Sequence, residues 1–167
     1  MLIRDERGTD HDAIRSVVAD AFKRHPHGGG HEHLLVDALR EAGVLTLSLV
    51  AEGNAEIVGH VAFSPVRIGG TFQGWYGLGP VAVRPDRQGK GIGQALVRAG
   101  LDRLRALGAE GCVVLGEPAF YGRFGFKADS RLRLDGVPPE YFLALPFGPT
   151  VPGGAVEYHE AFALRLI

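Results

Sequence analysis

The sequence contains one cysteine, one methionine and one tryptophan among its 167 residues. A single cysteine excludes an internal disulfide and a multi-cysteine metal site. Cys112 lies in the apolar run 112–115, which predicts a buried, unreactive strand thiol. No apolar run reaches the length of a membrane-spanning helix, and the first residues lack the basic and apolar regions of a secretion signal. We therefore expect a cytoplasmic protein with no membrane partner.

Neither sign of charge dominates the sequence. The chain has 18 Lys and Arg residues and 19 Asp and Glu residues, for a net charge of −1. This balance indicates no nucleic-acid partner. Hydrophobic residues make up 46% of the chain and charged residues 22%, as is typical of globular domains. The length fits one domain, and we find no repeat or linker that would divide residues 1–167.

The hydrophobic periodicity predicts a chain that contains both strands and helices. The expected strands cover residues 2–4, 44–52, 57–68, 72–83, 111–116 and 126–134, with a closing strand at 156–166 that pairs with 126–134. A first helix is expected after a capping box of Thr9 and Asp12, and a second ends at Gly43. A third begins at Ile92 and ends at Gly108.

Two prolines interrupt the expected strands. Proline has no N–H to donate to a strand pair, so Pro65 indicates an edge position or a bulge. Pro80, which follows Gly77-Leu78-Gly79, indicates a bulge or a local opening within the strand 72–83.

A glycine-rich loop joins the strand 72–83 to the long helix. It reads Arg87-Gln88-Gly89-Lys90-Gly91-Ile92-Gly93. Glycines at a helix N-terminus allow close approach of a ligand, and the free N–H groups and the helix dipole favour an anion, best a pyrophosphate. A Walker loop would need a glycine at Arg84, and a dinucleotide fingerprint would need one at Gln94. A glycine-rich connection without a ligand is the alternative interpretation.

Two motifs together carry a family resemblance. The run 88–93 follows the pattern Gln/Arg-x-x-Gly-x-Gly/Ala and resembles the acyl-coenzyme A pyrophosphate loop of the GNAT-type N-acetyltransferase superfamily. The run 116–126 reads GEPAFYGRFGF and is similar to a segment of the YhbS-like branch of that superfamily. Glu117 departs from the aspartate common in that branch. The two motifs occur in the expected order, about 30 residues apart.

The resemblance implies a single-domain GNAT-like α/β (α+β) fold, in which a mixed, mostly antiparallel sheet with a splayed strand pair is flanked by helices. It implies acetyl-CoA as co-substrate. The pyrophosphate would be held by Arg87, Gln88, Gly89, Lys90, Gly91, Ile92 and Gly93, and the pantetheine arm by the backbone of Val81, Ala82 and Val83. The Val81 N–H would also polarise the thioester carbonyl. Tyr121 would contact the cofactor and protonate the departing thiolate; packing with a satisfied hydroxyl is its alternative role.

The sequence does not identify the general base that removes a proton from the acceptor amine. An alkyl amine titrates near 10.4, so acetyl transfer at neutral pH needs a proton acceptor. The strand offers no acid at residues 77–79. Glu117 is a candidate, directly or through water, but it can equally be an acidic cap for a helix that begins at Pro118. His60 and His159 titrate in a useful range, although a strand histidine is more often a core or surface residue.

Residues 25–33 contain four histidines and a glutamate, a composition that can ligate zinc or nickel. Three consecutive glycines within it, 28–30, favour a flexible loop instead, because metal sites need rigid support. We therefore expect no metal.

The sequence predicts an N-acetyltransferase that transfers acetyl from acetyl-CoA to a primary amine of a small molecule or a protein. The amine would attack directly within a ternary complex, since no side chain resembles an acyl-carrying nucleophile. A homodimer through a C-terminal edge strand is possible. The alternative is a non-catalytic acyl-CoA binding or sensing module, which the missing strand acid leaves open.

Overall fold

The computed structural model describes residues 1–23 and 31–166, with side chains up to residue 163. The strands are β1 (Leu2–Asp5), β2 (Leu47–Gly53), β3 (Glu56–Ile68), β4 (Thr71–Val83), β5 (Gly111–Leu115), β6 (Lys127–Ala128), β7 (Leu132–Arg133), β8 (Phe142–Pro146) and β9 (Gly154–Glu157). The α-helices are α1 (His11–Phe22), α2 (Glu32–Glu41), α3 (Ile92–Ala106) and α4 (Pro118–Tyr121). Short 3-10 turns include η1 (Gly8–Asp10), η2 (Pro85–Arg87), η3 (Gly122–Phe124), η4 (Pro139–Tyr141) and η5 (Glu160–Leu166).

The chain folds into two compact units. The first unit contains Met1–Phe63, Gly79–Arg103 and Glu160–Ile167, and the second contains Ser64–Leu78 and Leu104–His159. The long strands β3 and β4 contribute residues to both units. Each unit has its own sheet pairing and its own core, so each is described by itself.

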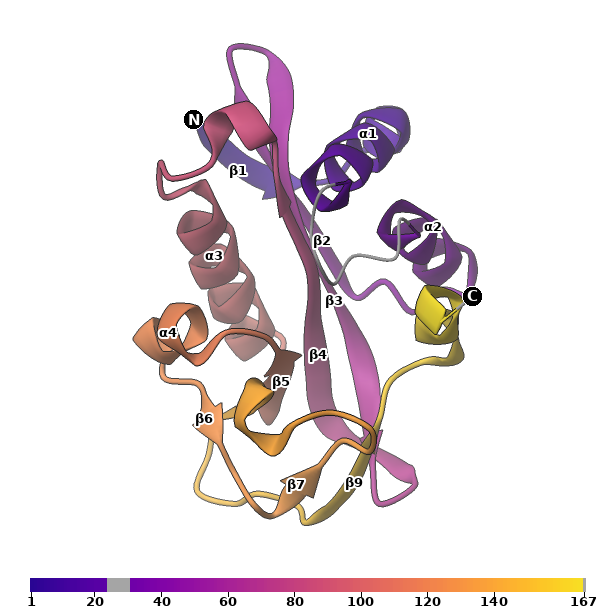
Figure 1. Cartoon of the computed structure of the whole chain (residues 1–167), viewed down its shortest axis with the longest axis vertical. Helices are drawn as coiled ribbons and strands as arrows, with labels where there is room; N and C mark the ends of the chain where they lie inside the picture. Colours follow the sequence, from indigo (N-terminus) through magenta and orange to yellow (C-terminus); the bar gives the residue numbers. More distant parts are fainter. Residues whose placement is uncertain (24–30, 167) are drawn as a thin grey trace. The chain divides into compact units, whose positions relative to one another are not determined.

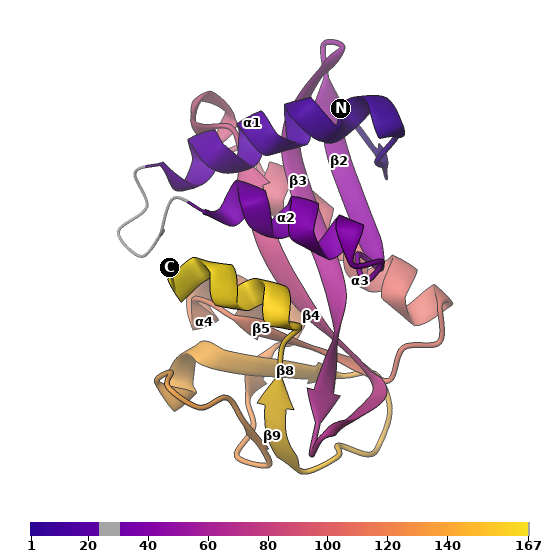
Figure 2. The same ribbon diagram turned by 90° about the vertical axis from the view of Figure 1, so that its right-hand side faces the viewer.

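The first unit is an antiparallel sheet in the order β1-β2-β3-β4 with helices on both faces. Helices α1 and α2 cover one face, and α3 lies on the other (Figures 1 and 2). The apolar stripe of α1 explains its position, because Ile14, Val17 and Val18 are buried against Val50 of β2 and Ala82 of β4. Helix α2 buries Leu35 and Leu39 against Ala161 of η5.

Two glycines set the close packing of α3 in this unit. A Cβ atom at Gly59 of β3 would lie 2.9 Å from Leu96 Cδ1 and 3.1 Å from Ile92 Cγ2. A Cβ atom at Gly100 of α3 would overlap the ring of Phe63. The helix therefore rests directly on the strand, which fixes the position of its N-terminal turn.

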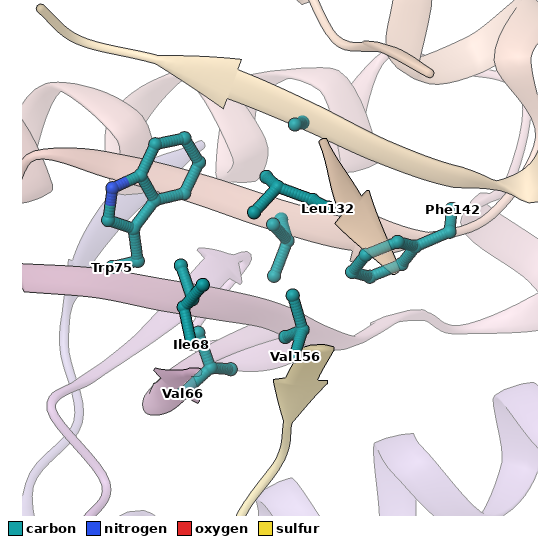
Figure 3. Close-up of a cluster of buried hydrophobic side chains, with 8 residues drawn as sticks. Val66, Ile68, Trp75, Leu132, Phe142 and Val156 are labelled. Carbon is teal, nitrogen blue, oxygen red and sulfur yellow. The ribbon is translucent and has the colours of Figure 1, made fainter. Parts of the chain in front are cut away.

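The second unit combines parallel and antiparallel pairing. β4 and β5 run parallel, with Trp75 opposite Gly111 and Gly77 opposite Val113. β5 and β6 each pair antiparallel with β8, while β9 pairs antiparallel with β3 and parallel with β7. The core of the second unit contains side chains from five strands. Figure 3 labels six of them, namely Val66, Ile68, Trp75, Leu132, Phe142 and Val156. The mixed, mostly antiparallel sheet flanked by helices confirms the predicted fold class.

Most of the predicted elements are confirmed, including both glycine helix ends. Gly43 and Gly108 have φ values of +74° and +83° and are each the second residue after the end of their helix, α2 and α3. Pro65 lies between the part of β3 that pairs with β2, which ends at Phe63, and the part that pairs with β9, which begins at Arg67, so it falls in a gap in strand pairing rather than on an edge strand. The prediction of one domain over residues 1–167 stays a prediction.

Four local predictions were wrong. The strand expected at 126–134 is two short strands, β6 and β7, separated by residues 129–131. Thr9 does not open α1: the Asp10 carboxylate accepts hydrogen bonds from the Arg7 N–H at 2.6 Å and from Arg4 Nη1 at 2.7 Å. The closing strand is only Gly154–Glu157, and residues 160–166 form a 3-10 turn that packs on α2. The strand Phe142–Pro146 was missed, because the prolines and glycines on both sides of it suggested an irregular stretch.

The parallel pairing of β4 with β5 ends at Gly77, although both strands continue. Immediately afterwards the Gly79–Pro80 peptide is cis and Gly79 has a φ of +143°. β4 itself continues to Val83, so what opens before Pro80 is its pairing with β5, which agrees with the predicted local opening. No helix in the part of the chain that the structure describes combines the length and the apolar character needed to cross a membrane.

Candidate functional site

The glycine-rich loop belongs to the first unit and has the predicted form. β4 ends at Val83, η2 covers Pro85–Arg87, and α3 begins at Ile92. Gly89 and Gly91 have φ values of +78° and +82°, which L-residues with side chains rarely adopt. A Cβ atom at either glycine would meet nothing within 4 Å. The loop is therefore an exposed backbone cradle with free space above both glycines.

The helix N-terminus completes this cradle. The Ala95 N–H donates to the Gly91 carbonyl at 3.1 Å, so the N–H groups of 92–94 precede the first intrahelical bond. Gln88 Nε2 donates to the Val83 carbonyl at 3.0 Å and ties the loop to the end of β4. Unbonded helix N–H groups beside the positive end of the dipole are suited to a phosphate group.

The basic side chains near the loop differ in whether they form ion pairs with the protein's own carboxylates. Arg84 is paired with Glu56 at 2.9 Å and with Asp86 at 3.1 Å. Among the described residues, the side chains of Arg87 and Lys90 have no ion pair or hydrogen bond, and Lys90 is exposed. These two cations are therefore available to an incoming anion, whereas Arg84 is not.

The second predicted motif lies in the second unit, where α4 and η3 carry an aromatic cluster. Tyr121 packs edge-on against Phe120 at 4.9 Å and Phe126 at 5.8 Å between ring centroids, and against Phe124 at 6.4 Å. A Cβ atom at Gly116 would lie 2.9 Å from Tyr121 Cδ2 and closer still to Cε2. The ring is thus held by aromatic neighbours and by the absence of a side chain at residue 116.

Burial changes the acid–base properties of this segment. Loss of hydration raises the pKa of Tyr121 to about 12, with a smaller contribution from Cys112. The phenol therefore stays protonated at neutral pH and remains a proton donor. Burial also raises the pKa of the Cys112 thiol, which agrees with the predicted unreactive strand cysteine.

Glu117 occupies the N-cap position of α4, with Pro118 at the first helical position as predicted. Its side chain is exposed and makes no capping hydrogen bond, so the acidic-cap interpretation holds only for its backbone position. On β4, a Cβ atom at Gly77 would lie 3.2 Å from Tyr158 Cδ2. The ring of Tyr158 therefore takes the space beside the strand where no acid is present.

The candidate residues lie in both units. Val81, Ala82 and Val83 and the loop 87–93 are in the first unit, whereas Glu117 and Tyr121 are in the second. His159 follows β9 in the second unit. His25 and His27 fall outside the described residues, so the histidine-rich segment is described only from His31 onward. Within residues 1–23 and 31–166, no three His, Cys, Asp or Glu side chains are grouped to hold a metal ion.

A buried polar network in the first unit was not predicted. His60 on β3 is 0% exposed, and its Nε2 lies 2.8 Å from Ser48 Oγ on β2. Ser48 in turn hydrogen-bonds to the carboxylate of Glu6, which is paired with Arg40 at 2.8 Å. Among these residues only the histidine gave a signal in the sequence, as a titratable side chain in an apolar strand.

Comparison with known proteins agrees with both motifs. Residues 45–128 match the family model described as an acetyltransferase (GNAT) domain. The uncharacterized N-acetyltransferase YhbS of Escherichia coli is 40% identical over 97% of this chain and 98% of its own length. A GNAT family acetyltransferase from Brucella melitensis, solved in complex with acetyl-CoA, is 52% identical with a TM-score of 0.88, over 96% of this chain and 97% of its own. The structure of E. coli YhbS in complex with CoA is 37% identical, also with a TM-score of 0.88, over 96% and 91% of the two chains.

The chain belongs to the GNAT acetyltransferase family. The near-complete match to YhbS also confirms the predicted branch of that family. Relatives of this chain are named N-acetyltransferases, as the sequence predicted for the enzyme class.

Proposed function

We propose that this protein transfers an acetyl group from acetyl-CoA to the primary amine of a small molecule or a protein. The observation that carries the proposal is the exposed backbone cradle at Gly89–Gly91, which precedes the free N–H groups of α3. It supports pyrophosphate binding through Arg87, Gln88, Gly89, Lys90, Gly91, Ile92 and Gly93. The similar Brucella protein, solved with acetyl-CoA, supports the choice of donor.

The remaining roles follow from the chemistry of each group. The backbone of Val81, Ala82 and Val83 holds the pantetheine arm, and the Val81 N–H polarises the thioester carbonyl. The amine attacks the thioester carbon directly in a ternary complex. Tyr121 donates a proton to the departing thiolate, which its raised pKa supports. Glu117 is a candidate proton acceptor for the amine, and its exposed side chain supports access to an incoming substrate.

Calorimetric titration with acetyl-CoA tests the cradle through a matched pair of variants. Gly91→Glu places a bulky negative charge in the cradle, whereas Gly108→Glu places one at the other end of the same helix. Both glycines have nearly equal positive φ values, +82° and +83°, and open space at Cβ, so both variants carry the same backbone strain. We expect binding to be lost in Gly91→Glu and kept in Gly108→Glu.

Two outcomes would change the proposal. Equal binding by both variants would show that the pyrophosphate is held elsewhere. Mass spectrometry can detect the acetylation of primary amines by the wild type. Tight binding of acetyl-CoA without any such acetylation would favour a non-catalytic acyl-CoA binding module. In either functional case we place the protein in the cytoplasm, and detection of it in a cytoplasmic fraction checks this.

A further inference from the structure

Glu6, Arg40, Ser48 and His60 form a chain of polar contacts that joins helix α2 to strand β3 in the first unit. The Arg40 guanidinium on α2 donates to the Glu6 carboxylate from Nε at 2.9 Å and from Nη2 at 2.8 Å. The Ser48 hydroxyl on β2 also donates to Glu6, and its oxygen lies 2.8 Å from His60 Nε2. We call these four residues the His60 anchor.

His60 points to the face of the sheet that α1 and α2 cover. Gly59 and Phe63 of the same strand both lie against α3 on the opposite face. Because side chains alternate along a strand, His60 faces the other way, under α1 and α2 (Figure 2). The ring is 0% exposed and lies opposite Val50 of β2, which is itself buried against α1. The two helices therefore separate His60 from solvent.

The hydrogen positions in the anchor follow from a count of donors. The Ser48 hydroxyl has one hydrogen, and the ionised carboxylate of Glu6 can only accept, so that hydrogen points to Glu6. Ser48 Oγ must then accept from His60 Nε2. This assigns the neutral Nε2–H tautomer to His60 and leaves Nδ1 with a lone pair. Among the described residues, His60 Nδ1 has no hydrogen-bond partner.

A proton on Nδ1 would therefore be unfavourable in the folded state. It would create a buried N–H group with no acceptor among the described residues, together with a buried positive charge, and each destabilises a fold. The charged groups that face the ring are Glu6 and Arg40, which have opposite signs and are paired with each other. Burial therefore dominates and lowers the pKa of His60 to about 4.

Ion pairs extend the anchor from α2 to α1. Asp37 accepts from Arg40 Nη1 at 3.0 Å and from Arg15 Nε at 2.9 Å, which ties the two helices together. His11, at the start of α1, lies 3.2 Å from the Glu6 carboxylate. A change at the inner end of the anchor therefore acts on both helices.

We propose that the His60 anchor is an acid-sensitive switch. At neutral pH the neutral imidazole holds α1 and α2 on the sheet of the first unit, and in acid its protonation favours a state in which the two helices have loosened from that face. A cavity of about 310 Å³, lined by Glu6, Arg40 and Ser48 among others, brings solvent to the outer end of the anchor but not to His60. The histidine therefore takes its proton in the open state. The switch goes beyond the proposed acetyl transfer and does not depend on it.

The direction of the pH effect follows from the proton affinity of His60 in the two states. In the closed state burial holds its pKa at about 4, whereas an exposed histidine has a pKa of about 6.5. Between these values the open state binds more protons than the closed state, so acid favours opening. The stabilisation from neutral His60 is complete above about pH 6.5 and is lost as the pH falls toward 4. From pH 7 to pH 5 the opening equilibrium constant should rise about 20-fold.

Two neighbouring groups also titrate, and they can be separated from His60. Burial would raise the pKa of Glu6, but hydrogen bonds from Arg40 and Ser48 outweigh it and lower that pKa from its ordinary value. Glu6 therefore stays ionised down to pH 5. A charged His11 would strengthen its contact with Glu6 and so oppose release. The variant His11→Gln removes that opposing contribution.

Hydrogen exchange of the α2 amides, corrected for the intrinsic pH dependence of amide exchange, tests the switch in the full chain. We expect protection of α2 to be about 20-fold weaker at pH 5 than at pH 7 in His11→Gln, and to fall somewhat less in the wild type. His60→Gln, whose amide can still donate to Ser48, should show none of this change. Trp75, the only tryptophan of the chain, lies in the core of the second unit, so its fluorescence should stay constant.

Three results would overturn the switch. Equal α2 protection at both pH values in His11→Gln would do so, as would the same loss of protection in His60→Gln. A parallel change in Trp75 fluorescence would show that acid unfolds the second unit as well, rather than releasing two helices. If His60→Gln does not fold, nitrogen-15 NMR of the wild-type His60 ring decides the question. The switch requires the neutral Nε2–H tautomer in the folded protein at pH 6, and an imidazolium there would contradict it.

Discussion

The two motifs that identify the family are built in opposite ways. The loop 87–93 is glycine-rich and exposed at residues 88–91, and the groups that we propose for recognition are main-chain N–H groups at the start of α3. The segment 116–126 is organised around one mostly buried side chain, Tyr121, which three phenylalanines surround. A change of side chain in the loop therefore matters through the space it fills, whereas a change in the segment matters through the chemistry or orientation of the tyrosine.

The largest effect we predict in this comparison comes from Tyr121→Phe. The variant keeps the ring and its packing but removes the proton donor, so kcat should fall by about 100-fold or more while acetyl-CoA affinity is retained. Steady-state kinetics with calorimetry checks both quantities. Tyr141→Phe is the control, because that phenol is 38% exposed and lies outside the aromatic cluster. An unchanged kcat in Tyr121→Phe would remove the tyrosine from the chemistry.

A smaller effect is expected from moving the tyrosine rather than removing its hydroxyl. In Gly116→Ala the new methyl group overlaps the Tyr121 ring, which should lower the free energy of unfolding by about 1–3 kcal/mol and also reduce kcat. Gly122→Ala is the matched control, since its φ is −59° and a Cβ atom there meets nothing within 4 Å. Thermal unfolding of the two variants measures the difference. Equal stability would show that the ring has room to shift.

The smallest effect should come from a charge on the loop. Lys90 is exposed, and exposed ion pairs contribute about 1 kcal/mol or less. Lys90→Ala should therefore raise the KM for acetyl-CoA by no more than about fivefold, and added salt should erase the difference. Lys127→Ala, in the second unit, serves as the control. A loss as large as that of Gly91→Glu would mean that side-chain charge, not backbone, dominates binding.

The sequence was most informative where short-range rules act. The loop, the glycine ends at Gly43 and Gly108, and Pro118 at the start of α4 could be predicted because each depends on local backbone preferences. The gap in strand pairing at Pro65 agrees with the same kind of rule, because proline has no N–H to donate. The second motif was found through a run of eleven residues that resembles a family segment, and its aromatic packing then followed from the structure.

Long-range pairing accounts for what was missed. Strand β8 forms because β5 on one side and β6 on the other supply its hydrogen bonds. The sequence of residues 142–146 does not indicate those partners. Thr9 had the composition of a cap, but the neighbouring Asp10 carboxylate accepts hydrogen bonds from the Arg7 N–H and from Arg4, a residue on β1. The chain from Glu6 through Ser48 to His60 joins residues 42 and 12 positions apart. Contacts between residues so far apart in the sequence produce no hydrophobic periodicity from which they could be predicted.

The burial of Cys112 has a practical consequence for studying this protein. It is the only thiol of the chain, it is 0% exposed, and burial raises its pKa, so the folded protein should be silent toward thiol reagents. A colorimetric thiol assay would then count only coenzyme A as it is released, without background from the enzyme. In the absence of substrate, the slow appearance of one thiol per chain would report unfolding instead. One buried sulfur atom thus allows the same reagent to follow turnover and unfolding in separate experiments.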